Sequence, residues 1–188
     1  MAIQKWKKLS QKEFKGSYKT FLTKEFELPN GSKHSFDIWY LKNGFIGVFA
    51  LTKDLEVITA TSYRPGPEMI LQEMPFGIVD DGETTKQAAI RELLEETGYQ
   101  PTKTIMLGEN IAWMPYADGM GNYFLALDCK LVSKQKLDDA EDINVELIPL
   151  KTYVKEVLRK GKTSHSECGW LAIDYLLQNK IINLDDIS

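Results

Sequence analysis

The sequence predicts an α/β fold, and three observations support this class. Strand-like runs separated by turn signals fill the chain before about residue 75. One segment near residues 85–97 carries helix signals at both ends, and helical periodicity returns after about residue 150. A chain of 188 residues that is 43% hydrophobic is large enough for one ordinary domain with a proper core.

The first third of the chain predicts a meander of short strands, mostly antiparallel. Tyr18–Leu28 combines strand-forming residues with partial alternation of apolar and polar side chains. The pairs Asn30-Gly31 and Asn43-Gly44 are turn signals between successive runs. Further strands are expected at residues 35–41, 45–51, 56–62 and 69–74.

The next segment predicts a helix from about Thr85 to Thr97. Thr84 is placed to act as N-cap, and Gln87, three residues later, completes a capping box. Gly98 stands where a left-handed residue ends a helix. We expect an apolar side that packs on the core, formed by Ile90, Leu93 and Leu94.

Three carboxylates of this helix, Glu92, Glu95 and Glu96, are spaced i, i+3 and i+4, and they therefore share one face. Like charges at these offsets repel one another, so they add nothing to an isolated helix. A bound divalent cation would turn that repulsion into attraction. The helix is therefore a candidate site for a hard metal ion and for phosphate chemistry.

The second half predicts strands near residues 104–107, 123–131 and 143–147. An aromatic and glycine-rich loop, Trp113–Gly121, separates the first two of these strands. Lys151–Lys160 is expected to be helical and to stop at Gly161. Ser164 with Glu167 resembles a second capping box, which predicts a final helix to about Lys180.

Charge and cysteine content narrow the class of protein. A net charge of −4 argues against non-specific binding to nucleic acid or to an anionic membrane. The two cysteines, Cys129 and Cys168, fit reduced thiols better than a disulfide scaffold. The lysine-rich N-terminus has no apolar leader segment, and no run approaches membrane-span length. We expect a cytoplasmic protein with neither membrane nor nucleic-acid partners.

The segment from Gly77 to Tyr99 resembles the Nudix box: Gly, five residues, Glu, seven residues, Arg-Glu, an apolar residue, any residue, Glu-Glu, any residue, Gly and an apolar residue. Tyr99 departs from the pattern, since the family usually has an aliphatic residue there. The resemblance implies an α/β/α sandwich with a mixed β-sheet. It also implies two parts, a small N-terminal antiparallel β-layer for dimerisation at residues 1–44 and the Nudix hydrolase domain at residues 45–188. The positions that match the box are Gly77, Glu83, Arg91, Glu92, Leu93, Glu95, Glu96 and Gly98.

By this resemblance the box binds Mg²⁺, with Mn²⁺ as the alternative, and hydrolyses a diphosphate. Glu92 and Glu96 are the implied principal metal ligands, with Glu95 close by and the carbonyl of Phe76 added. Arg91 is expected to brace the carboxylates, and Glu83 to steady the loop. Glu95 and Glu96 also count as catalytic residues of the box. Glu141, or otherwise Asp139, is expected to help deprotonate the attacking water or to bind a further ion.

The flanking residues resemble the branch of the family that contains the ADP-ribose and nucleoside diphosphate sugar pyrophosphatases. The run Tyr63–Pro65, then Gln72–Gly77, is similar to the segment that precedes the box in that branch. Pro115 follows Tyr99 by sixteen residues, as a proline does there. The expected substrate contacts are Arg64 as a diphosphate clamp, Glu73 at the nucleobase, Pro115, and Trp113 stacked on a base. For Arg64, Glu73 and Trp113 a purely structural role is the alternative.

Several alternatives stay open at the level of sequence. Residues 116–123 lack the Ser-Pro-Gly stretch and glutamate of many ADP-ribose hydrolases, which leaves a GDP-hexose or a dinucleotide as substrate. A non-catalytic nucleotide-binding Nudix module and an isoprenoid diphosphate isomerase are further alternatives. The intact box argues against the first, and the positions of Cys129 and Cys168 argue against the second. The expected partners are the small-molecule substrate and a second copy of the chain.

Overall fold

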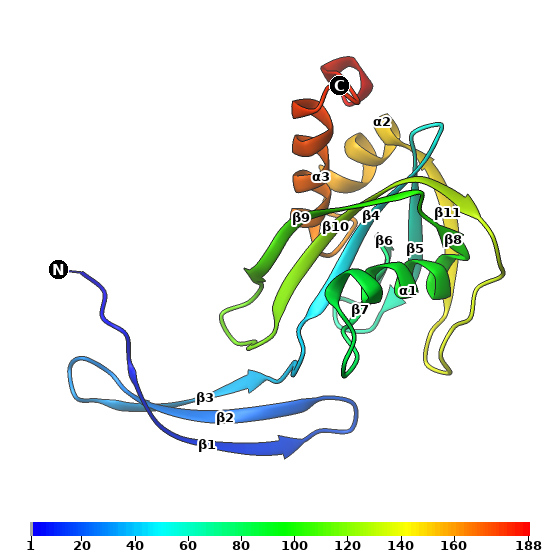
Figure 1. Cartoon of the computed structure of the whole chain (residues 1–188). Helices are drawn as coiled ribbons and strands as arrows, with labels where there is room; N and C mark the ends of the chain where they lie inside the picture. The colour runs from blue at the N-terminus through cyan, green and yellow to red at the C-terminus, as the bar shows by residue number, and fades with distance from the viewer. Residues whose placement is uncertain (1) are drawn as a thin grey trace.

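A computed structural model describes residues 2–188. A small antiparallel sheet of three strands, β1 (Lys7–Lys15), β2 (Thr20–Glu27) and β3 (Lys33–Trp39), projects from one side of the main body (Figure 1). The antiparallel N-terminal layer is therefore confirmed. β1 was not among the predicted strands, because its side chains are polar and almost all exposed, so it lacks apolar alternation.

The main body is built on a mixed sheet. The order of its central path is β11-β5-β4-β10-β8, with β6 on β5, β7 on β4 and β9 on β10. β4 and β10 run parallel, and the other strand pairs are antiparallel. The strands are β4 (Phe45–Thr52), β5 (Glu56–Arg64), β6 (Met69–Glu73), β7 (Phe76–Ile78), β8 (Tyr99–Gln100), β9 (Lys103–Ala112), β10 (Met120–Leu131) and β11 (Ile143–Pro149).

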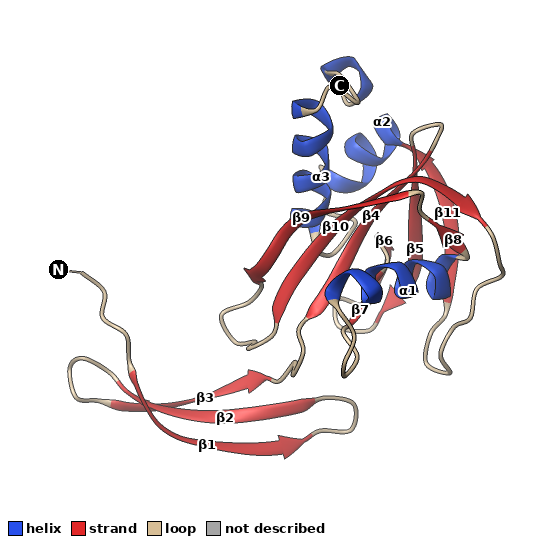
Figure 2. Cartoon of the chain, viewed as in Figure 1, coloured by secondary structure: helices blue, strands red, loops and turns tan. Residues whose placement is uncertain are grey.

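Helices cover both faces of this sheet (Figure 2). The helix α1 (Thr85–Thr97) packs on one face. On the other lie α2 (Leu150–Thr152), which continues as the π-helix η1 (Tyr153–Leu158), and α3 (Ser166–Gln178); η2 (Leu184–Asp186) closes the chain. β4 is buried on both sides: Phe45, Phe49 and Leu51 join the core under α3, while Ile46, Val48 and Ala50 join the core under α1. The predicted α/β/α arrangement with a mixed sheet is confirmed.

α1 forms where the sequence predicts it, with the predicted caps. Thr84 Oγ1 accepts the Gln87 amide at 3.2 Å, and Gln87 Oε1 accepts the Thr84 amide at 2.9 Å. Gly98 ends the helix at φ +78°, a left-handed conformation that glycine adopts without strain. The predicted apolar side is partly wrong. Its buried residues are Ala88, Ala89, Leu93, Glu96 and Thr97, whereas Ile90 and Leu94 are only half-buried.

The second capping box is wrong. His165, not Ser164, is the N-cap of α3; its backbone is left-handed at φ 51°, and no side chain caps the helix. The Ser164 hydroxyl instead donates to Glu73, which lies 91 positions earlier in the chain. A long-range hydrogen bond has therefore taken the group that a local cap would have used.

One loop ties the N-terminal sheet to the main body. The Trp39 amide donates to the Tyr116 carbonyl at 2.8 Å, and the Asp118 amide donates to the Trp39 carbonyl at 3.1 Å. The Asp118 carboxylate accepts from the Leu41 amide at 3.0 Å and from Lys24 Nζ at 3.1 Å. Residues 113–119 therefore lie against both the N-terminal sheet and the linker that follows it.

Candidate active site

The candidate site lies where β7 passes over α1. The Phe76 amide donates to Glu96 Oε2 at 3.1 Å, which joins the strand to the helix. At the next residue, Gly77, a Cβ would lie 1.9 Å from Glu92 Oε1, so no larger residue fits unless Glu92 moves. The Glu92 and Glu96 side chains therefore lie directly beside the Phe76–Gly77 backbone, and the glycine makes that approach possible.

Arg91 holds the loop before the helix and two of the box glutamates. Its Nε and Nη2 donate to the two carboxylate oxygens of Glu83, each at 2.9 Å, as a bidentate pair. Its Nη1 donates to Glu92 Oε1 at 2.8 Å and to Glu95 Oε2 at 3.2 Å. Its Nη2 also reaches the Ile78 carbonyl at 3.2 Å. The arrangement is the brace that the box resemblance implies for Arg91 and Glu83.

Burial and like charge disfavour the ionised carboxylates of this site. Burial raises the pKa of Glu92 to about 7, with repulsion from Glu95 and Glu141 adding to it and Arg91 opposing it. Glu96 is only 4% exposed. Burial, followed by repulsion from Glu92 and Glu141, raises its pKa well above the usual range. Glu141 is exposed, and the repulsion that it adds to the pKa of both glutamates is smaller than the effect of their burial.

The donor chemistry of this site fits a hard divalent cation. Glu92 and Glu96 offer carboxylate oxygens beside the Phe76–Gly77 backbone, and carboxylate oxygen is a ligand type that Mg²⁺ or Mn²⁺ takes. A cation there would offset the repulsion that raises both pKa values. The ligands are not preassembled, since within residues 2–188 no three His, Cys, Asp or Glu side chains converge on one metal position. Arg91 holds Glu92 and Glu95 through one carboxylate oxygen each, so the second oxygen of each could bind a metal.

Two of the predicted substrate contacts bind each other. Arg64 Nε donates to Glu73 Oε2, and the Ser164 hydroxyl donates to Glu73 Oε1. Glu73 is buried, at 4% exposure, whereas the Arg64 side chain is 40% exposed. Both oxygens of Glu73 are therefore engaged within the protein, while Arg64 keeps an exposed face.

The Trp113 side chain belongs to an aromatic cluster beside the site. Its ring centroid lies 5.1 Å from those of Trp39, Phe45 and His165. His165 stacks in turn on Phe76, with centroids 4.2 Å apart and planes 16° from parallel. Trp113 therefore packs against three other rings and stays partly exposed, and its stacking on a base remains a prediction.

Sequence reasoning missed three residues near the site. His165 was not singled out, and Ser164 was assigned to a cap. Lys19 was not singled out; its Nζ lies 3.3 Å from the Trp39 ring centroid. Burial and the nearby charge of Arg64 lower the pKa of Lys19. No local motif marks these residues, because each reaches the site from a distant part of the chain.

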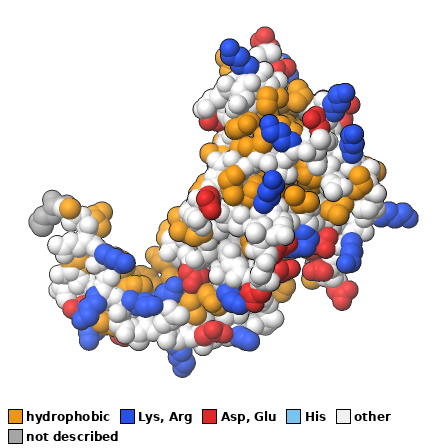
Figure 3. Space-filling view, in the orientation of Figure 1, with side chains coloured by type: hydrophobic (Ala, Val, Ile, Leu, Met, Phe, Trp, Pro, Cys, Tyr) orange, Lys and Arg blue, Asp and Glu red, His pale blue; other side chains and the backbone are white. Residues whose placement is uncertain are grey.

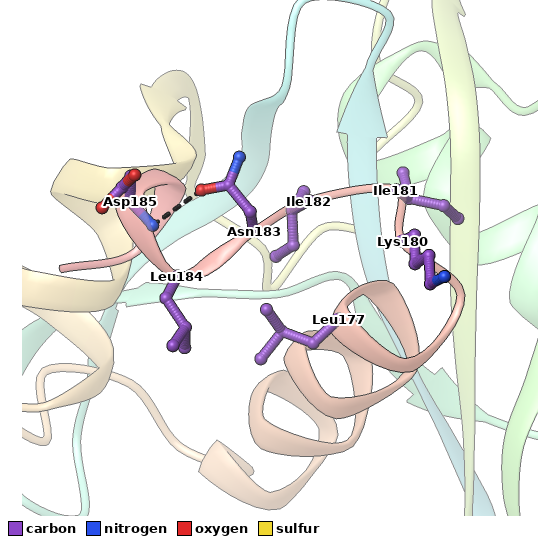
Figure 4. A pocket seen from close by; sticks show the side chains of 7 residues that line it. All are labelled: Leu177, Lys180, Ile181, Ile182, Asn183, Leu184 and Asp185. Carbon is purple, nitrogen blue, oxygen red and sulfur yellow. Dashed lines mark hydrogen bonds between the residues drawn. The ribbon is translucent and has the colours of Figure 1, made fainter.

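Pro115 lies apart from the box glutamates. It is exposed and lines a cavity of about 380 Å³ between the N-terminal sheet and loop 113–119. In the space-filling view, acidic side chains gather around α1 and the neighbouring loops, and lysines are spread over the N-terminal sheet (Figure 3). A larger hollow of about 700 Å³ lies at the far end of α3 (Figure 4), lined by Leu177, Lys180, Ile181, Ile182, Asn183, Leu184 and Asp185.

Comparisons with known proteins identify the relatives of this chain. The NUDIX domain family model matches residues 41–168. An ADP-ribose pyrophosphatase of Bacillus subtilis (strain 168) is 30% identical over 146 residues, which cover 77% of this chain and 78% of the relative. A methanol dehydrogenase activator of Bacillus methanolicus is 30% identical over 167 residues, or 87% of each chain. The crystal structure of an ADP compounds hydrolase superposes with a TM-score of 0.81 at 20% identity, covering 97% of this chain and all of the other, so it supports the fold. No helix among residues 2–188 has the length and apolar character that a membrane span requires.

Proposed function

This chain belongs to the NUDIX family and is a Nudix hydrolase of the ADP-ribose pyrophosphatase type; from that premise we propose that it hydrolyses the diphosphate of ADP-ribose, or of a related nucleoside diphosphate sugar, in a metal-dependent reaction. The products would be a nucleoside monophosphate and a sugar phosphate. The observation that carries the proposal is the contact of the Glu92 and Glu96 side chains with the Phe76–Gly77 backbone, which places two box carboxylates beside the same strand.

A divalent cation bound there would neutralise the diphosphate oxygens and acidify a bound water. Glu92 and Glu96, with the Phe76 carbonyl, would hold the cation, and Glu95 lies at the exposed edge of the same face. Arg91 keeps these side chains on the β7 side of α1 through its bonds to Glu83 and Glu92. Glu141 is the proposed proton acceptor, because it is exposed and stands close to both ligands.

Arg64 is the proposed diphosphate clamp. Its guanidinium is anchored through Nε and partly exposed, which leaves nitrogen donors for anionic oxygens. Glu73 is committed to Arg64 and Ser164, so its role is to hold Arg64 rather than to bind a nucleobase. The base and sugar specificity would then come from the side of Trp39, Lys19 and loop 113–119.

A substrate panel tests this function. The purified chain is incubated with ADP-ribose, a GDP-hexose, a dinucleoside polyphosphate and a nucleoside triphosphate, with Mg²⁺, with Mn²⁺ or with a chelator. Products are separated by chromatography, and phosphomonoesters are detected after phosphatase treatment. ADP-ribose is expected to give AMP and ribose 5-phosphate, and only with a divalent metal. Preferred hydrolysis of the GDP-hexose or the dinucleotide would redirect the substrate assignment, and turnover that survives chelation would refute the metal dependence.

We further propose that the N-terminal sheet joins two copies of the chain. Three aromatic side chains in or beside this sheet are exposed: Trp6 is 41% exposed, Phe14 42% and Tyr18 84%. A three-stranded sheet with one open face is marginally stable without a covering surface. A second copy would supply that cover and also protect the exposed edge strand β1.

A further inference from the structure

Glu73 is the last residue of β6, and each of its two carboxylate oxygens accepts a hydrogen bond from a different part of the chain. Arg64, the last residue of β5, donates from Nε to Oε2. Ser164, two residues before α3, donates from its hydroxyl to Oε1. Among residues 2–188 these two donors are the hydrogen-bond partners of the carboxylate. A carboxylate buried to 4% exposure needs such partners, because burial without them disfavours the charged form.

This geometry fixes the orientation of Arg64. Among residues 2–188 the hydrogen bond that holds the guanidinium is made through Nε, and the side chain remains 40% exposed. Its two terminal nitrogens are therefore free to face an anionic ligand in a planar fork. The position of that fork depends on the Glu73 carboxylate, whose other oxygen accepts from Ser164.

The segment that carries Ser164 is itself fixed against the strand. The Gln72 amide donates to the Lys162 carbonyl at 3.0 Å, so residues 162–164 run beside β6. Thr163 Oγ1 donates to the Ser164 carbonyl at 3.0 Å. The Ser164 hydroxyl is therefore delivered to Glu73 by backbone that has little freedom to move.

We propose that Ser164 is a positioning residue for substrate binding: its hydroxyl orients Glu73, and Glu73 orients the guanidinium of Arg64 toward the diphosphate of the substrate. The inference rests on the proposed function for the identity of the ligand. Ser164 does not touch the ligand, and Arg64 does. The link also connects the N-terminal end of α3 to substrate affinity, although no box residue lies in that helix.

Removal of the Ser164 hydroxyl should weaken substrate binding more than it slows the chemical step. In Ser164→Ala, Glu73 Oε1 loses its donor and the carboxylate can rotate, so Arg64 loses its fixed orientation. A hydrogen bond to a charged group of this kind corresponds to about a 10-fold change in affinity. We expect KM for ADP-ribose to rise by about that factor, with kcat changed by less than about 3-fold. Ser164→Thr keeps the hydroxyl and should restore most of the affinity.

A double-mutant cycle separates positioning from a general loss of structure. KM is measured for wild type, Ser164→Ala, Arg64→Ala and the double variant. If Ser164 acts through Arg64, the Ser164→Ala change has little further effect once Arg64 is gone. Additive effects would overturn the proposal. The matched control is Ser166→Ala, a serine in the same segment with no side-chain hydrogen bond among the described residues; it should leave KM unchanged.

A spectroscopic readout tests the same link without substrate. The chain has only three arginines, Arg64, Arg91 and Arg159, so the ¹⁵N Nε region of an NMR spectrum is simple to assign with Arg64→Lys. The Arg64 Nε–H signal should be sharp and protected from exchange in wild type and in Ser164→Thr, and should broaden or shift in Ser164→Ala. An unchanged signal in Ser164→Ala would overturn the proposal. A wild-type chain that hydrolyses no diphosphate would refute the proposed function instead, and the NMR comparison would still decide whether Ser164 orients Arg64.

Discussion

The Glu92 side chain fills the space beside Gly77: a Cβ at position 77 would lie 1.9 Å from the Glu92 carboxylate oxygen Oε1. The glutamate is thereby held against the strand backbone instead of reaching into solvent. Arg91 donates to the same oxygen at 2.8 Å and completes the restraint. This contact explains in physical terms why the box pairs a glycine with a glutamate fifteen residues later.

Gly77→Ala should displace Glu92 and abolish most activity. A misplacement of about 1 Å at a reacting centre costs on the order of 100-fold in rate. Overpacking also lowers stability by about 1–3 kcal/mol. Turnover and thermal unfolding are measured together. Gly66→Ala is the control, because a Cβ at Gly66 meets nothing within 4 Å and the variant should resemble wild type. Wild-type kcat in Gly77→Ala would contradict the role given to this contact.

Arg91→Lys should destabilise the apo protein. A lysine cannot reproduce the bidentate pair with Glu83 or reach Glu92 and Glu95 at the same time. The expected loss is about 1–3 kcal/mol in the free energy of unfolding, measured in urea without added metal. Lys86→Ala, on the exposed side of α1, should stay within about 0.5 kcal/mol of wild type. An Arg91→Lys variant as stable as that control would show that the brace contributes nothing.

Glu96→Gln should separate stability from activity. The amide oxygen can still accept from the Phe76 amide, so the fold is kept. Because burial and Glu92 disfavour the charged form of Glu96, the neutral variant should be at least as stable as wild type without metal. Turnover should fall by about 100-fold or more, since a carboxylate of the box is lost. Near-normal turnover at saturating Mg²⁺ would remove Glu96 from the metal site.

Glu167→Gln should lower the free energy of unfolding most above about pH 4.5, the usual pKa of a glutamate carboxyl. His165, and after it the Tyr123 hydroxyl, lower the pKa of Glu167 from its usual 4.5 to about 2. A carboxyl with a depressed pKa in the folded state contributes stability above about pH 4.5 and loses it as the pH falls toward 2. The stability difference between wild type and Glu167→Gln should therefore shrink on acidification. Glu13→Gln, on the exposed strand β1, is the control, and a difference that grows on acidification would reverse the assignment.

Light scattering on a sizing column should give a mass twice the 21.5 kDa of the chain. The reason is the exposed aromatic side chains Trp6, Phe14 and Tyr18 in or beside the N-terminal sheet, which a second copy would cover. Phe14→Glu places a charge on that sheet and should shift the population toward monomer. Lys7→Glu, which also changes charge on β1, is the comparison. A wild-type monomer at every concentration tested would end the dimer proposal.

The parts of the fold that sequence could predict are those with local causes. Thr84, Gln87 and Gly98 define the ends of α1 through bonds within one helical turn, so the helix is predictable residue by residue. β4 is predictable because a run of apolar residues after Asn43-Gly44 matches a strand buried on both sides. The spacing of the box predicted that Glu92 and Glu96 share a helix face.

The parts that sequence could not predict depend on distant partners. β1 is a strand because β2 pairs with it, not because of its own side chains. The burial of Glu96 depends on the Phe76 amide, twenty positions away, which no helical pattern reveals. Ser164 was predicted to cap a helix because the local sequence does not reveal its actual acceptor, Glu73, which lies 91 positions earlier on β6. Tertiary contacts thus decide the surroundings of the site, while local signals decide its helix.

The Asp118 carboxylate connects loop 113–119 to the N-terminal sheet and to the linker after it. It accepts from Lys24 on the sheet and from the backbone amide of Leu41 in the linker, so one side chain bonds the loop to both segments. Loss of this carboxylate would therefore remove two of the contacts that attach the sheet and the linker to the loop.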